Sequence, residues 1–355
     1  MRIFQVITVS EYGGAQSVVT NLLEKMSAEN NVFILYGGNG EAWQVLDDNV
    51  TKIKISAPRK SFSLKDIILL FRLFYYQFKY NPDIVHLHSS KMGALGRIAF
   101  NPKKIVYTIH GTDSMRKAFR PILYVEKLMK SRTARFIGVS QYDVDALKEE
   151  GISKNADLIY NGLIDYPQEA SIKELPEITA KLNNIKQKYP KIIMCIARIS
   201  KQKKFDLFLD LAKKMPQYAF VWLGNKNKIQ GMPPNTYCLG EVSSAHVYLK
   251  HADLFILPTN YEGLPVSILE ALAYSIPVVA SDVGGVSEML NGKNGFAVEN
   301  NIKSFEDKIE YCLSDDIHPQ MSLAARESYL EKFTIDKMVN RYMKIYKQVY
   351  ERNRK

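Results

Sequence analysis

Glu262 and Glu270 are the residues of this chain whose type and spacing best suit chemistry, because two carboxylates eight positions apart can hold two parts of one ligand. Gly-Leu-Pro follows Glu262, and Pro265 suits the first turn of a helix. Such a helix places Glu270 about 7.5 Å along its axis from Pro265. The amides of Gly263 and Leu264 at its N-terminus attract an anion such as a diphosphate. Together these groups predict a site for a nucleotide sugar.

Two strand-like segments flank these residues and must position them. DLFILPT, at 253–259, is an apolar run of strand length, and PVVAS, at 277–281, is another. A strand, a helix and a strand in this order form a βαβ unit. Its loop and helix N-terminus lie at the carboxyl edge of a parallel sheet, where open α/β sheets bind ligands. The spacing alone leaves open that Glu270 is simply a solvated helix residue.

Glu-Gly-Leu-Pro, a helix with a second glutamate, and the loop SDVGG at 281–285 together resemble the signature of the family 4 retaining glycosyltransferases. The resemblance implies that Glu262 contacts the transferred sugar and that Glu270 holds the ribose of the nucleotide. It also implies the GT-B fold, in which two Rossmann-like α/β domains with parallel sheets and helices on both faces face each other across a central cleft.

The rest of the chain is consistent with two such domains. Strand and helix patterns alternate through both halves, and 355 residues suit two cores. We expect an N-terminal acceptor domain at 1–165 and a C-terminal nucleotide-sugar-binding domain at 166–335. The proline-containing stretch 162–190 is the best linker candidate. Residues 336–355 form an amphipathic helix, which in the family packs back onto the N-terminal domain.

Arg198 and Lys203 form a second constellation, after the apolar run 191–197. Arginine binds phosphate through two hydrogen bonds, and lysine supplies a compact charge. Their spacing of five resembles the family's pair that neutralises the nucleotide diphosphate. The family carries glycine at the next position, where this chain has Lys204, which we interpret as a surface residue. The alternative is that this basic run is only the solvated start of a helix.

A glycine pair follows the first strand-like run of the chain. Gly13 and Gly14 open a helix, where a bare backbone can approach a phosphorylated ligand closely. The dinucleotide-binding pattern GxGxxG is absent. The resemblance implies that this loop, with Gln16 as a possible cleft residue, lies near the diphosphate and the reacting sugar.

His110 ends a strand-like run and precedes a glycine. It matches the family's active-site His-Gly, although a lone histidine near a strand is more often structural. His86 and His88 raise the possibility of a metal site with His110, but no carboxylate or cysteine joins them at a recognisable spacing. We therefore expect no metal ion and no other cofactor. Arg198, Lys203 and helix amides are then the groups that stabilise the leaving diphosphate.

Two further loops belong to the predicted site. Asn161-Gly is a turn sequence that resembles a family motif beside the cleft. Gly240-Glu-Val242 corresponds to the loop whose backbone contacts the base, and Val242 is therefore a predicted nucleotide-binding residue. No side chain there identifies the base, so UDP is expected only because uracil is the commonest base among such enzymes.

The net charge of +11 is unevenly distributed, because Thr51–Arg135 holds 18 Lys or Arg against four Asp or Glu. Within it, residues 67–80 and 114–132 mix cations with apolar side chains. Part of that apolar surface must pack onto a sheet. The excess of cations suggests an anionic membrane surface as a partner. Nucleic acid is disfavoured because no RRM, KH or zinc pattern is present.

Other sequence features limit the location. No run of 18 apolar residues lacks a charge, the N-terminus has no signal-peptide pattern, and the three cysteines share no metal-ligand spacing. We expect a cytoplasmic protein that associates peripherally with the inner face of the cell membrane.

The predicted function is a retaining, metal-independent transfer of a hexose or N-acetylhexosamine from a nucleotide diphosphate sugar. The expected acceptor is a glycan or a polyprenyl-diphosphate-linked sugar in capsule, O-antigen or other surface polysaccharide assembly. Two alternatives stay open, namely a sugar-nucleotide epimerase of the same fold and a non-catalytic nucleotide-sugar-binding scaffold. The residues expected to act in catalysis are Glu262, His110, Arg198 and Lys203.

Overall fold

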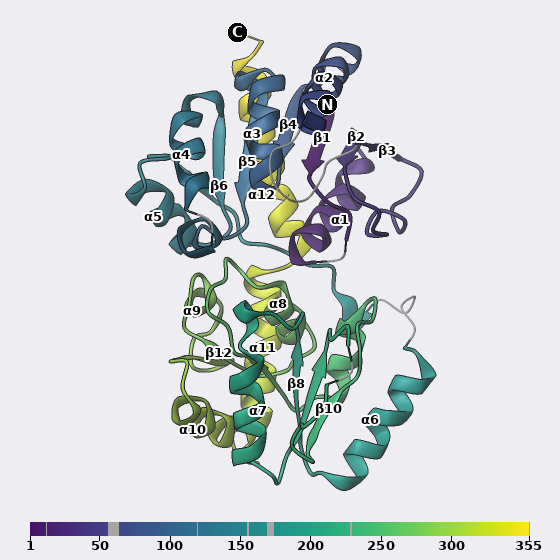
Figure 1. Cartoon of the computed structure of the whole chain (residues 1–355), viewed down its shortest axis with the longest axis vertical. Helices are drawn as coiled ribbons and strands as arrows, with labels where there is room; N and C mark the ends of the chain where they lie inside the picture. The colour runs from purple at the N-terminus through teal and green to yellow at the C-terminus, as the bar shows by residue number, and fades with distance from the viewer. Residues whose placement is uncertain are drawn as a thin grey trace. The chain divides into compact units, whose positions relative to one another are not determined.

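The structure is a computed structural model that describes residues 1–11, 13–55, 64–118, 120–154, 156–168, 174–227 and 229–354. Some predicted features fall partly outside these residues, namely the glycine loop (residue 12), the basic region (56–63 and 119) and the linker (169–173). The chain divides into two compact units (Figure 1). The N-terminal unit is Met1–Gly162 with Ile335–Lys355, and the C-terminal unit is Leu163–Thr334.

Within the described residues, the N-terminal unit has a seven-stranded parallel sheet in the order β3-β2-β1-β4-β5-β6-β7. Its strands are β1 (Arg2–Ile7), β2 (Asn31–Tyr36), β3 (Val50–Lys54), β4 (Ile84–Leu87), β5 (Ile105–Ile109), β6 (Arg135–Gly138) and β7 (Asp157–Leu158). Every residue of β4 and β5 is buried. Burial on both faces explains why these strands are continuous apolar runs in the sequence.

The helices of the N-terminal unit form two groups. They are α1 (Gly14–Ser27), α2 (Leu64–Tyr80), α3 (Ser90–Ala99), α4 (Pro121–Leu128), α5 (Gln141–Glu149) and α12 (Ile335–Arg352). Helix α3 contacts both α2 and α4, whereas α1 contacts α12, which also contacts β4 (Figure 1). The predicted apolar stripe of the last helix is buried, and it consists of Met338, Tyr342, Ile345 and Val349.

The C-terminal unit has a six-stranded parallel sheet within the described residues, in the order β10-β9-β8-β11-β12-β13. Its strands are β8 (Ile192–Ile196), β9 (Ala219–Leu223), β10 (Thr236–Cys238), β11 (Leu254–Leu257), β12 (Val278–Ser281) and β13 (Gly295–Val298). Its helices are α6 (Pro176–Lys188), α7 (Phe205–Lys214), α8 (Val266–Ala273), α9 (Val286–Met289), α10 (Ile302–Leu313) and α11 (His318–Lys332), with short 3₁₀ turns η5 (Lys201–Lys203) and η6 (Ala245–His251). The strand order runs outward from β8 in one direction and from β11 in the other. The loops after these two strands therefore meet at the switch point of the sheet.

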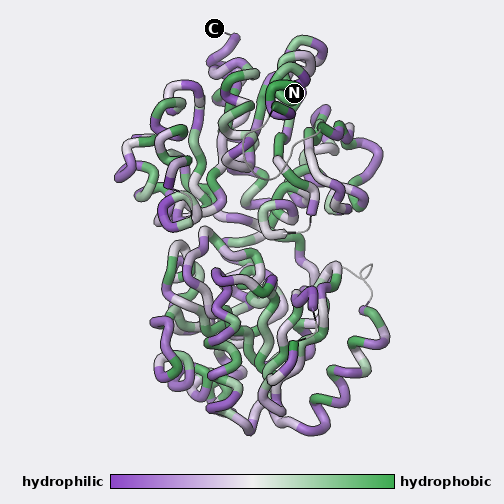
Figure 2. Tube along the Cα trace, viewed as in Figure 1, coloured by the Kyte–Doolittle hydropathy of each residue, from purple (hydrophilic) through white to green (hydrophobic). Residues whose placement is uncertain are grey.

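The predicted class, two Rossmann-like α/β domains with parallel sheets, is confirmed. The predicted βαβ unit is β11, α8 and β12, whose two strands pair in parallel. Strands β3, β7 and β13 were not predicted. Figure 2 shows the apolar character of the inner strands in both units. None of the described helices combines the length and apolar character needed to cross a bilayer.

Candidate functional site

An ion pair between Lys203 and Glu262 lies at the switch point of the C-terminal sheet. Lys203 ends η5 after β8, and Glu262 lies in the loop between β11 and α8. The Nζ atom of Lys203 is 2.5 Å from Oε1 of Glu262. The hydroxyl of Thr259 donates a hydrogen bond of 2.8 Å to the same carboxylate oxygen. Two residues that the sequence assigned separately to diphosphate and sugar are thus in direct contact in the unliganded protein.

Hydrogen bonds between the two loops hold this pair in place. Asn260 donates through its backbone N–H to the carbonyl of Gln202 at 2.8 Å, and through its side-chain amide to the carbonyl of Lys201 at 2.9 Å. Gln202 returns a bond of 2.7 Å from its side-chain amide to the carbonyl of Tyr261. The ion pair is therefore preorganised by residues that lie 59 positions apart in the sequence.

The predicted glycine loop after β12 supports Glu262 from the other side. The Gly285 N–H donates to the carbonyl of Gly263 at 2.9 Å. Gly284 has φ +57°, and a Cβ atom there would lie 2.1 Å from the backbone oxygen of Glu262. Only glycine permits this approach, so SDVGG is a structural support for the acidic loop.

Arg198 lies in the loop after β8 and is exposed. Within the described part of the chain, its guanidinium forms no hydrogen bond or ion pair, in contrast to Lys203. The loop itself is fixed, because Gly224 adopts φ +117° and a Cβ there would lie 2.4 Å from the carbonyl oxygen of Ala197. A cation without a protein partner on a fixed loop is suited to bind an anionic ligand.

Lys204, interpreted as a surface residue, is partly exposed and has an unusual backbone conformation. It precedes α7 with φ 37° and ψ 53°, in the left-handed region of backbone space. That region costs a residue with a side chain about 1–2 kcal/mol more than glycine. The conformation explains why a glycine is expected here, and Lys204 adopts it despite the cost.

Glu270 lies on α8 and is half-buried. No hydrogen bond or ion pair to its carboxyl occurs among the described residues. Burial raises the pKa of Glu270 to about 8, which favours the protonated carboxyl at neutral pH. The side chain is therefore less exposed than that of a fully solvated helix residue. A neutral carboxyl can both donate to and accept from a ligand hydroxyl.

The start of α8 differs by one position from the prediction. Pro265 is the N-cap, with ψ 119°, and Val266 is the first helical residue. Gly263 and Leu264 lie just before the cap, as expected for backbone amides at a helix N-terminus. The Gly263 N–H has no hydrogen bond within the described residues, whereas its carbonyl accepts from Gly285. This end of α8 retains a donor suited to an anion.

The predicted base-contacting loop lies after β10. Val242 is half-buried between β10 and η6. The Gly240 N–H donates to the side-chain oxygen of Asn225 at 2.8 Å, and the Gly240 carbonyl accepts from the Gly224 N–H at 2.7 Å. The backbone of this loop is thus tied to the end of β9.

An Arg–Asp pair that sequence reasoning missed fixes the far end of α8. Arg326 on α11 donates to both carboxylate oxygens of Asp165, at 2.7 and 2.5 Å, and to the Ala273 carbonyl at 2.8 Å. The hydrogen bond to Asp165 is the main cause that raises the pKa of Arg326. Asp165 therefore fixes Arg326 against the C-terminal end of α8. No pattern in the sequence of α11 predicted this pair.

The predicted residues of the N-terminal glycine loop have local structural partners. Gly13 is the N-cap of α1, with extended backbone, and Gly14 is the first residue of this helix. Gln16 is buried and donates to the carbonyl of Val9 at 3.3 Å. Asn161 is buried as well. The structure thus gives Gln16 a contact that stabilises its own loop.

The histidines of the N-terminal unit lie close together, and the contacts between them are a hydrogen bond and ring contacts. His88 Nδ1 lies 3.2 Å from His110 Nε2, and the rings of His86 and His88 have centroids 3.8 Å apart. Across the described ranges, no group of three or more His, Cys, Asp or Glu side chains could hold a metal ion. Burial lowers the pKa of His110 to about 4, so its imidazole is neutral at pH 7.

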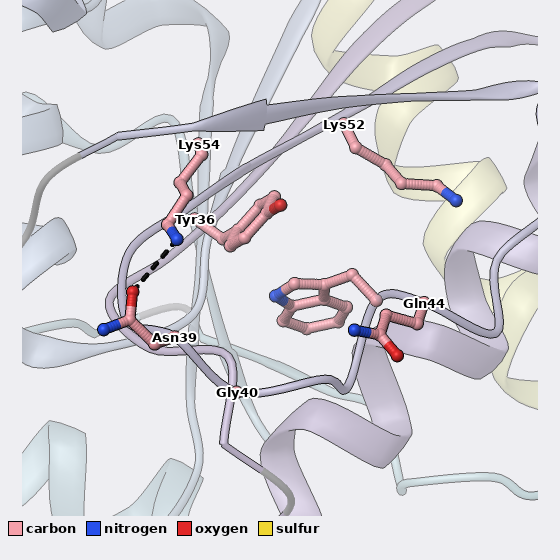
Figure 3. Close-up of a pocket in the computed structure, with 7 residues that line it drawn as sticks. Tyr36, Asn39, Gly40, Gln44, Lys52 and Lys54 are labelled. Carbon is pink, nitrogen blue, oxygen red and sulfur yellow. Dashed lines mark hydrogen bonds between the residues drawn. The ribbon is translucent and has the colours of Figure 1, made fainter.

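A pocket of about 420 Å³ opens beside β2 and β3 in the N-terminal unit (Figure 3). It is lined by Tyr36, Asn39, Gly40, Trp43, Gln44, Lys52 and Lys54. Figure 3 shows the Lys54 ammonium bonded to the Asn39 side-chain oxygen, at 3.0 Å, while Lys52 donates to the Leu46 carbonyl at 2.6 Å. Neither lysine pairs with a carboxylate of the described chain. Within the described residues, no carboxylate compensates the two positive charges of this pocket, and no separate sequence pattern predicted it.

Comparison with protein families matches both units. Residues 12–164 match the model described as Glycosyltransferase Family 4, and residues 190–315 match the model described as Glycosyl transferases group 1.

Similar proteins agree with these matches. The chain is 28% identical to the O-antigen biosynthesis glycosyltransferase WbnH of Escherichia coli, over 96% of this chain and 97% of that protein. It is 26% identical to the UDP-Gal:alpha-D-GlcNAc-diphosphoundecaprenol alpha-1,3-galactosyltransferase of E. coli, over 94% and 93%. Among solved structures, Anabaena Alr3699/HepE in complex with UDP-glucose superposes with a TM-score of 0.83 at 17% identity, over 98% of this chain and 99% of that one. This likeness shows the fold.

Proposed function

Because the chain belongs to the glycosyltransferases of family 4 and group 1, we propose that it moves a hexose or N-acetylhexosamine from a UDP-sugar to a lipid-linked glycan in surface polysaccharide assembly. The Lys203–Glu262 pair carries this proposal, since it places a cation for a diphosphate beside a carboxylate for sugar hydroxyls. The relative named for a diphosphoundecaprenol-linked acceptor and the O-antigen relative support the choice of acceptor and pathway.

Four residues of the C-terminal unit have proposed roles toward the donor. Arg198 and Lys203 bind the diphosphate, Glu262 binds hydroxyls of the transferred sugar, and Glu270 binds the ribose. Arg198 meets the phosphates directly because no group of the described residues occupies it. Lys203 must exchange part of its contact with Glu262 for a phosphate oxygen, which frees a lone pair of Glu262 for the sugar.

The proposed transfer retains the configuration at the sugar C1 atom. The bond from C1 to the diphosphate oxygen breaks, and its electron pair stays on the diphosphate, where Arg198 and Lys203 stabilise the charge. The acceptor hydroxyl attacks C1 from the face that the diphosphate leaves, and a diphosphate oxygen takes its proton. Glu262 is not assigned as a nucleophile, because Lys203 and Thr259 already bind its Oε1 atom. Two cations supply the charge that the leaving group needs, so we propose no metal ion for this step.

Transfer from UDP-sugars to a polyprenyl-diphosphate-linked sugar tests the function. We expect a product one sugar heavier and release of UDP. A thermal-shift panel of UDP, GDP and ADP should show stabilisation by one nucleotide, about 2.7 kcal/mol at 100 times its dissociation constant. Donor conversion without acceptor would instead identify an epimerase. Nucleotide binding with neither transfer nor donor hydrolysis would identify a scaffold, and no response to any nucleotide would contradict the proposal altogether.

We also propose that α2 binds an anionic membrane surface, such as the inner face of the cell membrane. Helix α2 buries Leu69 and Leu73 against the sheet, yet exposes a second apolar stripe on its opposite face. The exposed fraction is 70% for Phe71 and 82% for Phe78. The other exposed members of the stripe are Leu64, Ile67, Ile68 and Tyr75. A helix that is apolar on two faces packs only one of them against its own core, so the other face is available for a partner.

Cations border this stripe and favour a lipid surface as its partner. Lys65, Arg72 and Lys79 are spaced by seven, so they lie along one side of α2, and all three are exposed. None pairs with a carboxylate of the described chain. An apolar stripe with a row of cations at its edge is typical of a helix that lies in the interface of an anionic bilayer.

Vesicle co-sedimentation tests the membrane proposal. The protein should bind vesicles that contain anionic lipid at low salt, and less so neutral ones. The double variant Phe71→Ser/Phe78→Ser should lose at least a hundredfold in binding, since each buried aromatic is worth about 1.5–3 kcal/mol. Leu323→Ser is the control, because Leu323 is 68% exposed on α11 in the other unit. Equal binding by all three proteins would contradict the proposal, and lipid-independent dimerisation abolished by the double variant would assign the stripe to a second copy of the chain.

The pocket beside β3 is our proposed site for an anionic group of the acceptor. Lys52 and Lys54 line it and pair with no carboxylate among the described residues, and Tyr36 and Trp43 supply aromatic surface for a sugar ring. A sugar attached to a diphosphate combines both features.

A further inference from the structure

A buried hydrogen-bond network links the last helix of the N-terminal unit to His110. Helix α12 runs alongside the sheet and contacts β4 (Figure 1). The network connects β1, β4, β5 and α12, and its members are Gln5, His86, His88, Thr108, His110, Tyr342 and Tyr346. No carboxylate or cation belongs to it, so its protons are distributed by hydrogen bonding alone.

Gln5 is the link in this network between α12 and His88. Its amide nitrogen donates to the Tyr346 hydroxyl at 3.1 Å, and its amide oxygen lies 2.6 Å from His88 Nε2. Tyr346 in turn lies 2.6 Å from His86 Nδ1. His88 presents its other nitrogen, Nδ1, to His110 Nε2 at 3.2 Å. A single side chain thus couples α12 to His110.

The position of each proton follows from the amide of Gln5. An amide oxygen only accepts, so the proton of His88 must be on Nε2. His88 Nδ1 is then an acceptor, and the neighbouring Nε2 of His110 must be the donor. Burial lowers the pKa of His88 well below its usual value, as it does for His110, so each imidazole carries one proton at neutral pH. The Nδ1 atom of His110 is left with a lone pair and with no partner in the described chain.

We propose that Gln5, held by Tyr346 of the returning helix, is a positioning residue that keeps His110 in the Nε2–H tautomer, so that His110 Nδ1 accepts a hydrogen bond from a hydroxyl of the sugar substrate. The tautomer is a property of the protein alone. The identity of the ligand rests on the proposed function.

The opposite tautomer is a defined alternative. If the Gln5 amide were reversed, its nitrogen would donate to His88 Nε2, and every donor and acceptor along the chain would exchange. His110 would then carry its proton on Nδ1 and offer a donor to the sugar. The two arrangements therefore differ in which ring nitrogen of His110 carries the proton, and Gln5 decides between them.

Nitrogen-15 NMR of the histidine side chains in the unliganded protein distinguishes the two tautomers. The chain has six histidines, and a His110→Asn sample assigns the signal of interest. We expect the Nε2–H form in the wild type. Gln5→Met removes the donor and acceptor while keeping the length of the side chain, and should give a mixture of tautomers. Tyr346→Phe should give a mixture as well, and it preserves packing if the Gln5 variant folds poorly.

Tyr342→Phe is the matched control. Among the described residues, the Tyr342 hydroxyl forms its hydrogen bond with Thr108, at 3.0 Å, so its loss leaves the bonds from Gln5 to His110 intact. This variant should keep the wild-type tautomer and rate. Gln5→Met should lower kcat/KM for sugar transfer about tenfold, the effect of one lost hydrogen bond.

Each outcome decides one part of the inference. An Nδ1–H signal in the wild type would overturn the tautomer. An unchanged Nε2–H signal in both Gln5→Met and Tyr346→Phe would overturn the positioning role. If the variants alter the tautomer of His110 but not the rate of sugar transfer, the proposed contact between His110 and the sugar is wrong. A wild-type protein without any transfer would count against the proposed function, while the NMR signal would still identify the tautomer.

Discussion

The two units share a parallel-sheet plan and differ in how they carry charge. The N-terminal unit has 29 Lys and Arg against 17 Asp and Glu, whereas the C-terminal unit has 19 against 20. The entire excess of positive charge therefore belongs to the N-terminal unit. The cations proposed for the diphosphate nevertheless lie in the nearly neutral one. Two cations on fixed loops at a switch point suffice for a defined anion, while a diffuse excess suits an extended anionic surface.

The N-terminal unit uses its cations in two ways, which its sequence does not distinguish. Arg97 is fully buried and pairs with Glu126 at 2.6 Å, so it contributes nothing to a surface field. Arg116 pairs with Glu149 and Glu150 near the surface. By contrast, Lys65, Arg72 and Lys79 along α2 pair with no acidic side chain in the part of the chain that the structure describes. The basic excess seen in the sequence thus overstates the charge available to a partner.

We expect the largest change in stability when the buried Arg97–Glu126 pair is broken, and a much smaller one when the surface pairs of Arg116 are broken. Arg97→Met leaves the Glu126 carboxylate buried without its cation and should lower the free energy of unfolding by about 3–5 kcal/mol. Arg116→Met is the matched control and should cost less than about 1 kcal/mol, since its partners remain hydrated. Denaturant unfolding at pH 7 measures both. Equal effects would show that Arg97 belongs with the surface cations.

Lys203 should show the largest effect on catalysis. Lys203→Ala removes a cation from the leaving diphosphate and should lower kcat for transfer about 100- to 1,000-fold. Lys201→Ala removes a cation from the same turn, but only the Lys201 carbonyl bonds within the site. It should retain nearly full activity. Initial rates of UDP release at saturating acceptor measure the difference. Similar losses in both variants would mean that net charge, and not placement, binds the donor.

The raised pKa of Glu270 predicts that the folded state is less stable at alkaline than at acidic pH. Burial raises the pKa of Glu270 to about 8, above an unfolded value of about 4.3, so the native state holds its proton more tightly. The stabilisation this proton gives is complete below about pH 4 and is lost as pH rises toward 8. Relative to Glu270→Gln, the wild type should therefore lose about 3 kcal/mol of unfolding free energy between pH 5 and 8. Parallel pH curves for the two proteins would show that the carboxyl is hydrated.

Lys52 and Lys54 test whether the N-terminal unit also contains a defined anion site. The double variant Lys52→Ala/Lys54→Ala should raise the KM for a diphosphate-linked acceptor about tenfold, the equivalent of about 1.4 kcal/mol, with an unchanged KM for the donor. Lys103→Ala/Lys104→Ala removes two other cations of the same unit and should leave the acceptor KM unchanged. Equal increases in both would attribute acceptor binding to the overall positive field.

The sequence predicted the parallel sheets well, because inner strands buried on both faces are continuous apolar runs. It missed three edge strands, namely β3, with three exposed residues among five, the two-residue β7, and β13, which has only two buried residues among four. Among site residues, the motif around Glu262 was predictable from local spacing. Its contact with Lys203 was not, since it depends on loops 59 residues apart that meet only through the strand order.

The histidines show the same limit. Two histidines two apart on a strand and a third at the end of another indicate proximity, and the structure does bring His86, His88 and His110 together. Their chemistry is set by Gln5 and Tyr346, which lie 341 residues apart in the sequence. No local pattern marks either as a partner. The sequence therefore identifies which residues are near a site more readily than which protons they carry.

Lys204 gives the smallest expected effect. Its left-handed backbone, with φ 37°, favours glycine, although glycine also gains more freedom in the unfolded chain. Lys204→Gly should therefore raise the free energy of unfolding by about 0.5–1 kcal/mol, while Lys204→Ala, which keeps the strain, should not. Both variants remove the same charge beside the Lys203–Glu262 pair. If both retain the wild-type affinity for UDP, donor binding depends on two placed cations and not on a third nearby. A loss of affinity in both would place Lys204 in the diphosphate site. The C-terminal unit would then also bind its anion through a group of neighbouring cations, and the proposed difference between the two units would not hold.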